Sequence, residues 1–262
     1  MEAITKLESL FAARATRPGV LARRLLGKPL PGDERLAQLL CNERRAPTRM
    51  DGSLGGSLVA TGWAAWEMMD LGLDELHAGL SRLLTWVVTH LEGPLREPEP
   101  LPLILPNGTT LTDPADAAFA AECLGLRVVL RARYDGRPGV VQQLQRVLDG
   151  WTARRDELAA SALSVVALAP PQVREGLNAG VERLARSQQS DGTWGDANLF
   201  HMLEALLLAG IRPARAIVAR AAPALLRRQR PDGSFDDPPL EERALIGLRA
   251  ILVRVEDEGG GQ

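Results

Sequence analysis

Cysteine, aromatic side chains and long apolar runs are all scarce in this sequence of 262 residues. The two cysteines, Cys41 and Cys123, are too few and too far apart for a disulfide framework or a cysteine-rich zinc site, so we expect a cytoplasmic protein. Aromatic residues make up only 4% of the chain, and most of the apolar bulk comes from Leu, Ala and Val. This composition favours helices over strands. The apolar runs stop far short of the ~20 residues that a membrane-spanning helix requires.

The charges are balanced and give no sign of a nucleic-acid partner. Lys and Arg number 31 against 33 Asp and Glu, which gives a formal net charge of -2. Without a basic excess, the chain has little with which to follow a phosphate backbone. Residues 1–14 predict an amphipathic helix and not a signal peptide, because charged residues interrupt the apolar positions.

Two segments share the pattern Q-x-x-D-G-[ST]-aromatic: Gln188–Trp194 and Gln229–Phe235. Their aspartates, Asp191 and Asp232, are 41 positions apart. Once the proline-rich stretch 93–106 is removed, nearly the same spacing reaches three more D-G or N-G pairs, which begin at Asp149, Asn107 and Asp51. A regular spacing of this kind predicts a structural repeat.

Each repeat is predicted to hold two helices of different character. The helix before the turn is amphipathic, since the apolar positions between 214 and 226 form a single stripe. The helix after the turn is apolar nearly all round, as in 199–209 and 159–169, so it must be covered on several sides. We therefore predict an all-α fold in two concentric layers, with about six inner and about five to six outer helices. Residues 1–255 are predicted to form a single domain, and residues 256–262 a disordered tail.

The repeated turn resembles that of squalene-hopene cyclases and related class II terpene cyclases. Those enzymes contain an α/α toroid, which protein prenyltransferase β-subunits share in outline. The resemblance implies that this chain is an α/α toroid whose central apolar cavity holds an isoprenoid or similar hydrophobic molecule. It also implies that the glutamine and aromatic residue of each turn brace neighbouring helices, namely Gln188, Trp194, Gln229 and Phe235.

Class II cyclases of this family protonate their substrate with the middle Asp of a D-x-D-D motif at the start of an inner helix. Residues 113–116, Asp-Pro-Ala-Asp, resemble that motif, but Ala115 stands where the acid is expected. Asp113 and Asp116 are the nearest candidates for catalytic acids in a proton-initiated cyclisation. The alternative is that Asp113 caps a helix and Asp116 complements its dipole. The chain would then be a non-catalytic toroid that binds a hydrophobic ligand or another protein.

Aromatic faces line a cyclase cavity because they stabilise carbocations. The predicted inner helices supply few such residues for a polycyclisation: Trp63, Trp66, Phe119 and Phe200. We predict that they line a substrate pocket, with core packing between the layers as the alternative.

Four polar residues interrupt the same apolar helices and complete the candidate binding set: Glu67, Glu122, His201 and Glu204. An unpaired buried charge is costly, so each glutamate should pair with Arg or face the lumen. His201 and Glu204, at i and i+3, could form a proton-transfer pair. In the alternative, a carbonyl or carboxylate simply satisfies the buried imidazole of His201.

The residue pattern predicts no resident cofactor. The zinc of a prenyltransferase needs Asp, Cys and His together, and no Asp-x-Cys accompanies His201. Acids recur at the predicted starts of the inner helices, where they could hold Mg²⁺ and hence a diphosphate. The alternative is that these acids cap the helices.

The proline-rich stretch from Gly93 to Pro106 is predicted to be non-helical, and its LPLILP segment is apolar without an evident core to join. Three roles are open to it. It could form a lid over the mouth of a toroid, present a surface to a protein partner, or pack against the outer layer.

Overall fold

The computed structural model describes residues 2–93 and 98–259, and within them the fold is all-α. Its helices are α1 (Glu2–Phe11), α2 (Arg17–Leu25), α3 (Asp33–Arg45), α4 (Leu58–Asp70), α5 (Ala78–Glu92), α6 (Pro114–Arg131), α7 (Pro138–Leu148), α8 (Asp156–Val166), α9 (Leu177–Ser187), α10 (Leu199–Ala209), α11 (Arg212–Arg227) and α12 (Glu241–Gly259). Short 3₁₀ turns lie at Trp151–Ala153 and Arg174–Gly176. Strands β1 (Leu103–Ile104) and β2 (Thr110–Leu111) pair antiparallel, with Leu103 opposite Leu111.

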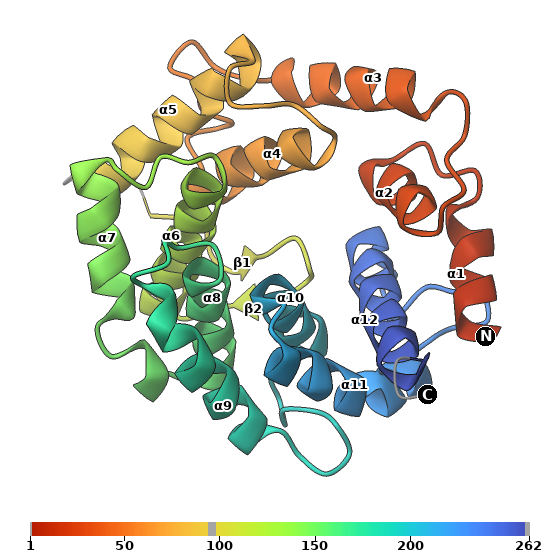
Figure 1. The fold of residues 1–262 in the computed structure, drawn as a ribbon. Helices are drawn as coiled ribbons and strands as arrows, with labels where there is room; N and C mark the ends of the chain where they lie inside the picture. The colour runs from red at the N-terminus through yellow and green to blue at the C-terminus, as the bar shows by residue number, and fades with distance from the viewer. Residues whose placement is uncertain (1, 94–97, 260–262) are drawn as a thin grey trace.

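The even-numbered helices pack against one another in succession. Helix α4 packs on α6, α6 on α8, α8 on α10, α10 on α12, and α12 on α2 (Figure 1). Between α2 and α4 the connection is made by α3, which packs on both. The odd-numbered helices lie outside this series, and α5, α7, α9 and α11 each pack on the even-numbered helices beside them (Figure 1).

Burial separates the two sets of helices as the sequence predicts. In α8, every residue from Leu158 to Val166 is buried. In α9, the buried residues follow a single stripe at i, i+3, i+4 and i+7: Leu177, Gly180, Val181 and Leu184. The contrast follows from packing, because an even-numbered helix is covered on several sides and an odd-numbered helix on one.

Four of the five predicted turns share one conformation. The glycine after the Asp or Asn has a positive φ in each: Gly52 (95°), Gly108 (84°), Gly192 (89°) and Gly233 (90°). The side-chain oxygen of the Asp or Asn accepts hydrogen bonds from both the backbone N–H and the hydroxyl of the Ser or Thr that follows the glycine. The fifth turn differs, since Gly150 leads directly into a 3₁₀ turn.

The turn glycines also fit closely against the next outer helix. A Cβ on Gly192 would lie 2.6 Å from the carbonyl oxygen of Arg220 in α11, and one on Gly233 would lie 2.5 Å from that of Lys6 in α1. The last turn therefore docks on the first helix of the chain as the preceding turn docks on α11.

The expected bracing by glutamine and tryptophan is confirmed. Gln188 Nε2 donates to the carbonyl oxygen of Ile217 in α11 at 3.2 Å, and Gln229 Nε2 donates to that of Ala3 in α1 at 3.1 Å. Trp194 Nε1 donates to the carbonyl oxygen of Leu184 at 2.7 Å. Phe235 is fully buried and packs edge-on against Phe200.

Residues 98–106, here called the strap, carry β1 and run through the middle of the even-numbered helices (Figure 1). They are non-helical, as predicted. The LPLILP segment joins the core through Leu103 and Leu105, which are buried, while Ile104 is 61% exposed. Residues 94–97 of the predicted insertion lie outside the described residues.

The prediction of a disordered tail from residue 256 is wrong for its first part. Helix α12 continues through Glu256 to Gly259, and residues 260–262 lie outside the described part of the chain. Among the helices of that part, none combines the length and apolarity needed to cross a bilayer.

Candidate functional site

One cavity, here called the first cavity, has a volume of about 670 Å³. It lies where α3 bridges α2 and α4, and the strap and the start of α12 complete its walls. Its lining is mainly apolar and rich in proline: Pro18, Leu40, Val59, Ala60, Trp63, Leu71, Pro100, Pro102, Leu103, Ile104 and Pro106. Such a wall suits an uncharged hydrophobic molecule.

The charged residues of the first cavity are held by partners. Arg17 is ion-paired with Glu242. Arg44 of α3 donates to Glu67 of α4 at 3.1 Å. Burial raises the pKa of Glu67, although the guanidinium of Arg44 opposes the shift. A carboxyl group of raised pKa is a weak acid, unlike the strong acid that protonation of an alkene requires.

Glu99 attaches the strap to α4. Its carboxylate accepts from Ser57 Oγ at 2.8 Å and from the backbone N–H groups of Leu58 and Val59 at 2.6 and 3.1 Å. These groups form the N-terminus of α4, where a negative charge is favourable. The strap is therefore a tethered wall of the first cavity.

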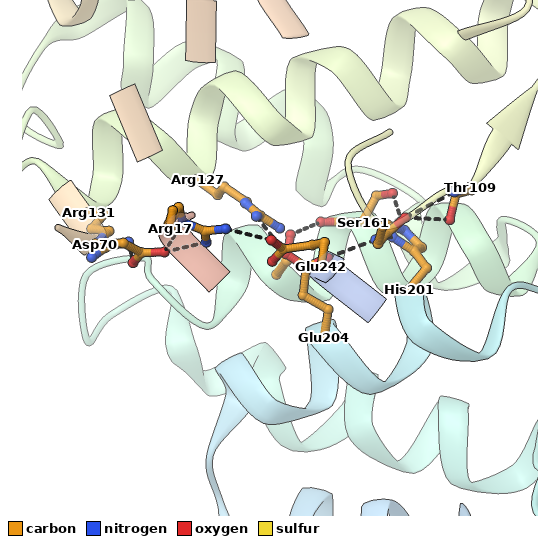
Figure 2. A network of polar contacts seen from close by, with 11 residues as sticks. Arg17, Asp70, Thr109, Arg127, Arg131, Ser161, His201, Glu204 and Glu242 are labelled. Atoms are coloured by element: carbon orange, nitrogen blue, oxygen red, sulfur yellow. Dashed lines mark hydrogen bonds and ion pairs between the residues drawn. The ribbon is translucent and has the colours of Figure 1, made fainter. Parts of the chain in front are cut away.

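A chain of buried ion pairs crosses the molecule beside this cavity (Figure 2). Arg17 Nε donates to Asp70 at 3.0 Å, and Arg131 donates to the other oxygen of Asp70 at 2.6 Å. Burial alone would lower the pKa of Arg17, but the carboxylates of Glu242 and Asp70 raise it above its usual range. Burial would likewise raise the pKa of Asp70, but Arg17 and Arg131 hold it below its usual value. Arg17 and Asp70 are therefore both charged at neutral pH.

The two tryptophans of α4 contact guanidinium groups of the protein itself. The guanidinium carbon of Arg17 lies 4.9 Å from the ring centroid of Trp63, and that of Arg127 lies 4.4 Å from Trp66. Arg131 also covers Trp66 at 4.3 Å. Trp63 lines the first cavity as expected. The faces of both rings are therefore engaged in cation–π contacts with arginines of the protein itself.

His201 and Glu204 of α10 are joined through the side-chain amide of Asn107. Asn107 Oδ1 accepts from the backbone N–H of Thr109, so Nδ2 must face His201 Nδ1 at 2.9 Å and Glu204 at 2.7 Å. Glu204 also accepts from Arg127 at 2.7 Å. Burial opposes ionisation of Glu204, but Arg127 and the other neighbours lower its pKa below the usual value.

The same geometry rules out a nucleophilic Ser161–His201 pair. Ser161 Oγ lies 2.8 Å from His201 Nε2, and the carbonyl oxygen of Glu157 lies 3.0 Å from the same nitrogen. Because Nδ1 accepts from Asn107, the neutral ring carries its hydrogen on Nε2, which cannot then take a proton from Ser161. Burial lowers the pKa of His201, so the ring is neutral at pH 7. His201 is satisfied by neighbouring groups, the alternative given by the sequence.

The space between His201, Glu204 and Arg127 is nearly filled. A cavity of only about 20 Å³ remains there, bounded on the other sides by α6, α8 and the strap. This is close to the volume of a single water molecule. His201 therefore lies away from the first cavity, where a small molecule would fit.

Asp113 and Asp116 are at the start of α6. Asp113 is exposed, and its Oδ1 accepts from the backbone N–H groups of Ala115 and Asp116, as an N-cap does. Asp116 pairs with Arg155 at 2.8 Å. Neither carboxylate lines the first cavity. These contacts match the capping alternative.

Of the predicted binding residues, only Trp63 and Glu67 line the first cavity. Phe119 packs under the guanidinium of Arg154, 3.8 Å from the ring centroid. Glu122 accepts from Gln143 of α7 at 2.6 Å, so it faces the outer layer. Phe200 is fully buried beside Phe235. Apolar periodicity could not separate these faces, because an inner helix is covered on both its lumen side and its outer side.

No cation site is formed by the acids at the helix starts. Within residues 2–93 and 98–259, no group of three or more His, Cys, Asp or Glu side chains could hold a metal ion. Asp156 pairs with Arg183 at 2.8 Å, and Asp116 with Arg155. Cys41 and Cys123 are both buried free thiols.

Several residues around the cavities were not predicted as site residues from the sequence: Arg17, Arg44, Asp70, Glu99, Asn107, Arg127, Arg131 and Glu242. Most are charged residues on helices, where surface exposure is the usual interpretation. Asn107 was recognised only as a turn residue. The proline-rich insertion beside the turn was the one available signal that this loop does more than connect helices.

Comparison with protein-family models gave no match, and no curated protein matched the sequence.

Proposed function

We propose that the protein is an α/α toroid that binds an uncharged, isoprenoid-like hydrophobic molecule in the first cavity without catalysing its cyclisation. Three features support the toroid. The even-numbered helices pack in succession and return from α12 to α2, the turns share one conformation, and the last turn docks on α1.

The observation that carries the binding proposal is the first cavity itself. Its volume of about 670 Å³ falls within the range of about 300 to 1,000 Å³ typical of small-molecule sites. Apolar side chains from α2, α3, α4 and the strap form most of its wall. Burying such a surface against an apolar ligand is favourable by about 25 cal/mol per Å².

The charge around the cavity favours a neutral ligand over a diphosphate. Two arginines line it against four glutamates: Arg17, Arg44, Glu67, Glu99, Glu241 and Glu242. The pairs Arg17–Glu242 and Arg44–Glu67 neutralise each other, and Glu241 pairs with Arg14 outside the lining. Both lining arginines are therefore already paired, and the carboxylate of Glu99 would repel an anion. A neutral isoprenoid, such as an alcohol or a hydrocarbon, meets no such repulsion.

Proton-initiated cyclisation is the less supported alternative. Asp113 caps α6 at the surface, and Asp116 is paired with Arg155. Glu67 does line the cavity, but burial raises its pKa and Arg44 is paired with it. An alkene is a very weak base, so its protonation needs a much stronger acid than Glu67.

Native mass spectrometry of the protein with farnesol, geranylgeraniol, squalene and farnesyl diphosphate tests the proposal. We expect one molecule of a neutral compound to be retained per chain and the diphosphate to be retained less. Product analysis of the same incubations should return the compounds unchanged. Retention of none of the four compounds would overturn the binding proposal, and a cyclised product would overturn its non-catalytic part.

A matched pair of variants tests whether the ligand binds in the first cavity. Ala60 lines the first cavity near the start of α4, whereas Ala118 is an exposed alanine near the start of α6. We expect Ala60→Trp to abolish retention by filling the cavity and Ala118→Trp to leave it unchanged. Equal retention by both variants would move the ligand out of the first cavity.

A further inference from the structure

A second cavity of about 390 Å³ lies along α12. Its wall is mostly apolar and comes from α2, α4, α10 and α12: Leu25, Trp66, Leu207, Leu208, Ile246, Leu252 and Val253. The lining of α12 runs from Glu242 to Glu256. At 1.5 Å per residue, that stretch is about 21 Å long.

Glu242 lines both cavities. Its carboxylate is ion-paired with Arg17, which lines the first cavity. The pair therefore belongs to the wall that the two cavities share, and most of the other lining residues of both cavities are apolar. Glu204, which lines the second cavity, lies near enough to Glu242 to act on its charge.

Arg17 is held firmly at this position. Its side chain is 4% exposed, and the guanidinium donates both to Asp70 and to Glu242, while its face lies over Trp63. Asp70 is held in turn by Arg131. Moving Arg17 aside would break several charged hydrogen bonds in a desolvated place, which is costly.

We propose that the Arg17–Glu242 ion pair is a specificity-determining partition that limits the length of the apolar chain bound in the first cavity. The inference rests on the proposed function, because it assumes that the first cavity binds such a chain. A ligand that fits the first cavity is accepted. A longer chain would have to displace the ion pair before its end could enter the second cavity.

The partition predicts a break in how affinity depends on chain length. Each methylene group that becomes buried raises the affinity by about fourfold. Saturated primary alcohols from octanol to hexadecanol, measured by displacement of the fluorescent probe N-phenylnaphthylamine, should follow this rise until the first cavity is full. Beyond that length the affinity of the wild-type protein should stop rising.

Opening the partition should remove the break. In Glu242→Ala the carboxylate is lost, while Arg17 keeps its bond to Asp70, so the rise should continue through the longer alcohols. Glu242→Gln, which keeps the volume and an acceptor for Arg17, should retain the wild-type break. Glu242→Ser is the second opening variant in case the alanine variant does not fold.

A double variant shows where the longer chain goes. Leu208 lines the second cavity and is half-buried, so Leu208→Trp should fill part of that space. In the wild-type background, we expect Leu208→Trp to leave the dependence of affinity on alcohol length unchanged. In the Glu242→Ala background, we expect it to make the affinity stop rising again at the length that fills the first cavity.

The outcomes separate this inference from the proposed function. Two results would overturn the partition and leave the binding proposal standing. In one, the affinity of the wild-type protein keeps rising through the longest alcohols. In the other, the affinity of the folded Glu242→Ala and Glu242→Ser variants stops rising at the same chain length as in the wild type. Failure of every alcohol to displace the probe, together with failure to retain isoprenoids, would overturn both.

Discussion

Gln229 and Ala3 are 226 positions apart, and the side-chain amide of the first donates to the carbonyl oxygen of the second at 3.1 Å. The bond joins the last turn of the chain to its first helix. Gln188 makes the equivalent bond to Ile217 of α11, so the same device that links one repeat to the next also attaches α1.

Removing the Gln229 amide should destabilise the whole fold. We expect Gln229→Ala to lower the free energy of unfolding by about 1 kcal/mol, because the partly buried carbonyl of Ala3 loses its donor. Urea denaturation followed by circular dichroism measures the change. Gln142→Ala, at an exposed position of α7, is the control and should change the value by less than about 0.5 kcal/mol. Equal effects would mean that the bond does not contribute to closure.

Alanine at the glycine of the last turn should be more harmful. Gly233 has a φ of 90°, and a Cβ there would meet the carbonyl of Lys6 at 2.5 Å. We expect Gly233→Ala to cost at least about 2 kcal/mol through backbone strain and displacement of α1. Gly136→Ala, where no atom lies within 4 Å of the added Cβ, should change the stability little. A tolerated Gly233→Ala would contradict the close docking of this turn on α1.

Much of the helical architecture could be predicted because its signals are local. A D-G turn needs a positive φ and a side-chain acceptor, and both requirements are visible in two adjacent residues. The apolar periodicity likewise predicts that α8 is buried nearly all round and that α9 is buried along one stripe. The prediction of disorder was wrong for residues 256–259 because glycines near the C-terminus suggested a tail, whereas α12 extends to Gly259.

The site was harder to predict because it depends on pairs that are distant in the sequence. Arg17 and Glu242 are 225 positions apart, and each alone resembles a surface charge on an amphipathic helix. Glu67 and Glu204 were recognised as unusual because they interrupt apolar helices, and both do pair with arginines. Local sequence shows that a buried carboxylate needs a partner, but not which arginine supplies it.

His201 should make stability depend on pH. Burial lowers the pKa of its imidazole below the ordinary value of 6.5, so the unfolded chain takes up a proton before the folded one does. The free energy of unfolding should therefore fall as the pH falls below about 6.5, by up to about 1.4 kcal/mol per pH unit, until the folded His201 is protonated.

The comparison of wild type with His201→Gln isolates this contribution. Glu67 and Glu242 have raised pKa values and act with the opposite sign, but they are present in both proteins. Urea denaturation at several pH values between about 7 and 5 should give a stability difference that shrinks as the pH falls. A difference that is independent of pH would show that His201 titrates alike in the folded and unfolded chain.

Asp113 should matter for stability and not for ligand binding. Its carboxylate caps α6 by accepting from two backbone N–H groups, so Asp113→Ala should lower the free energy of unfolding by about 1 kcal/mol. Asp113→Asn, which keeps an acceptor, should lower it less. Retention of farnesol in native mass spectrometry should be the same for both variants and the wild type. If a folded Asp113 variant no longer retained farnesol, Asp113 would have to be counted among the residues that bind the ligand.

Glu99 should control how fast a ligand leaves the first cavity. Its carboxylate ties the strap to Ser57, Leu58 and Val59 at the start of α4, and the strap forms one wall of the cavity. We expect Glu99→Ala to raise the dissociation rate of a bound fluorescent probe several-fold, because the wall loses charge-assisted hydrogen bonds worth about 1.5 to 3 kcal/mol each. Stopped-flow displacement with excess farnesol measures that rate.

The control for Glu99 is a variant that weakens the same helix end without releasing the strap. Ser57 Oγ accepts from the backbone N–H of Ala60 and donates to Glu99, so Ser57→Ala removes one cap bond and leaves the two backbone donors on the carboxylate. It should lower stability by about 1 kcal/mol but change the dissociation rate less than Glu99→Ala does. Only Glu99→Ala frees the strap. If the two variants release the probe equally fast, the dissociation rate is set by the capping of α4 and not by the attachment of the strap through Glu99.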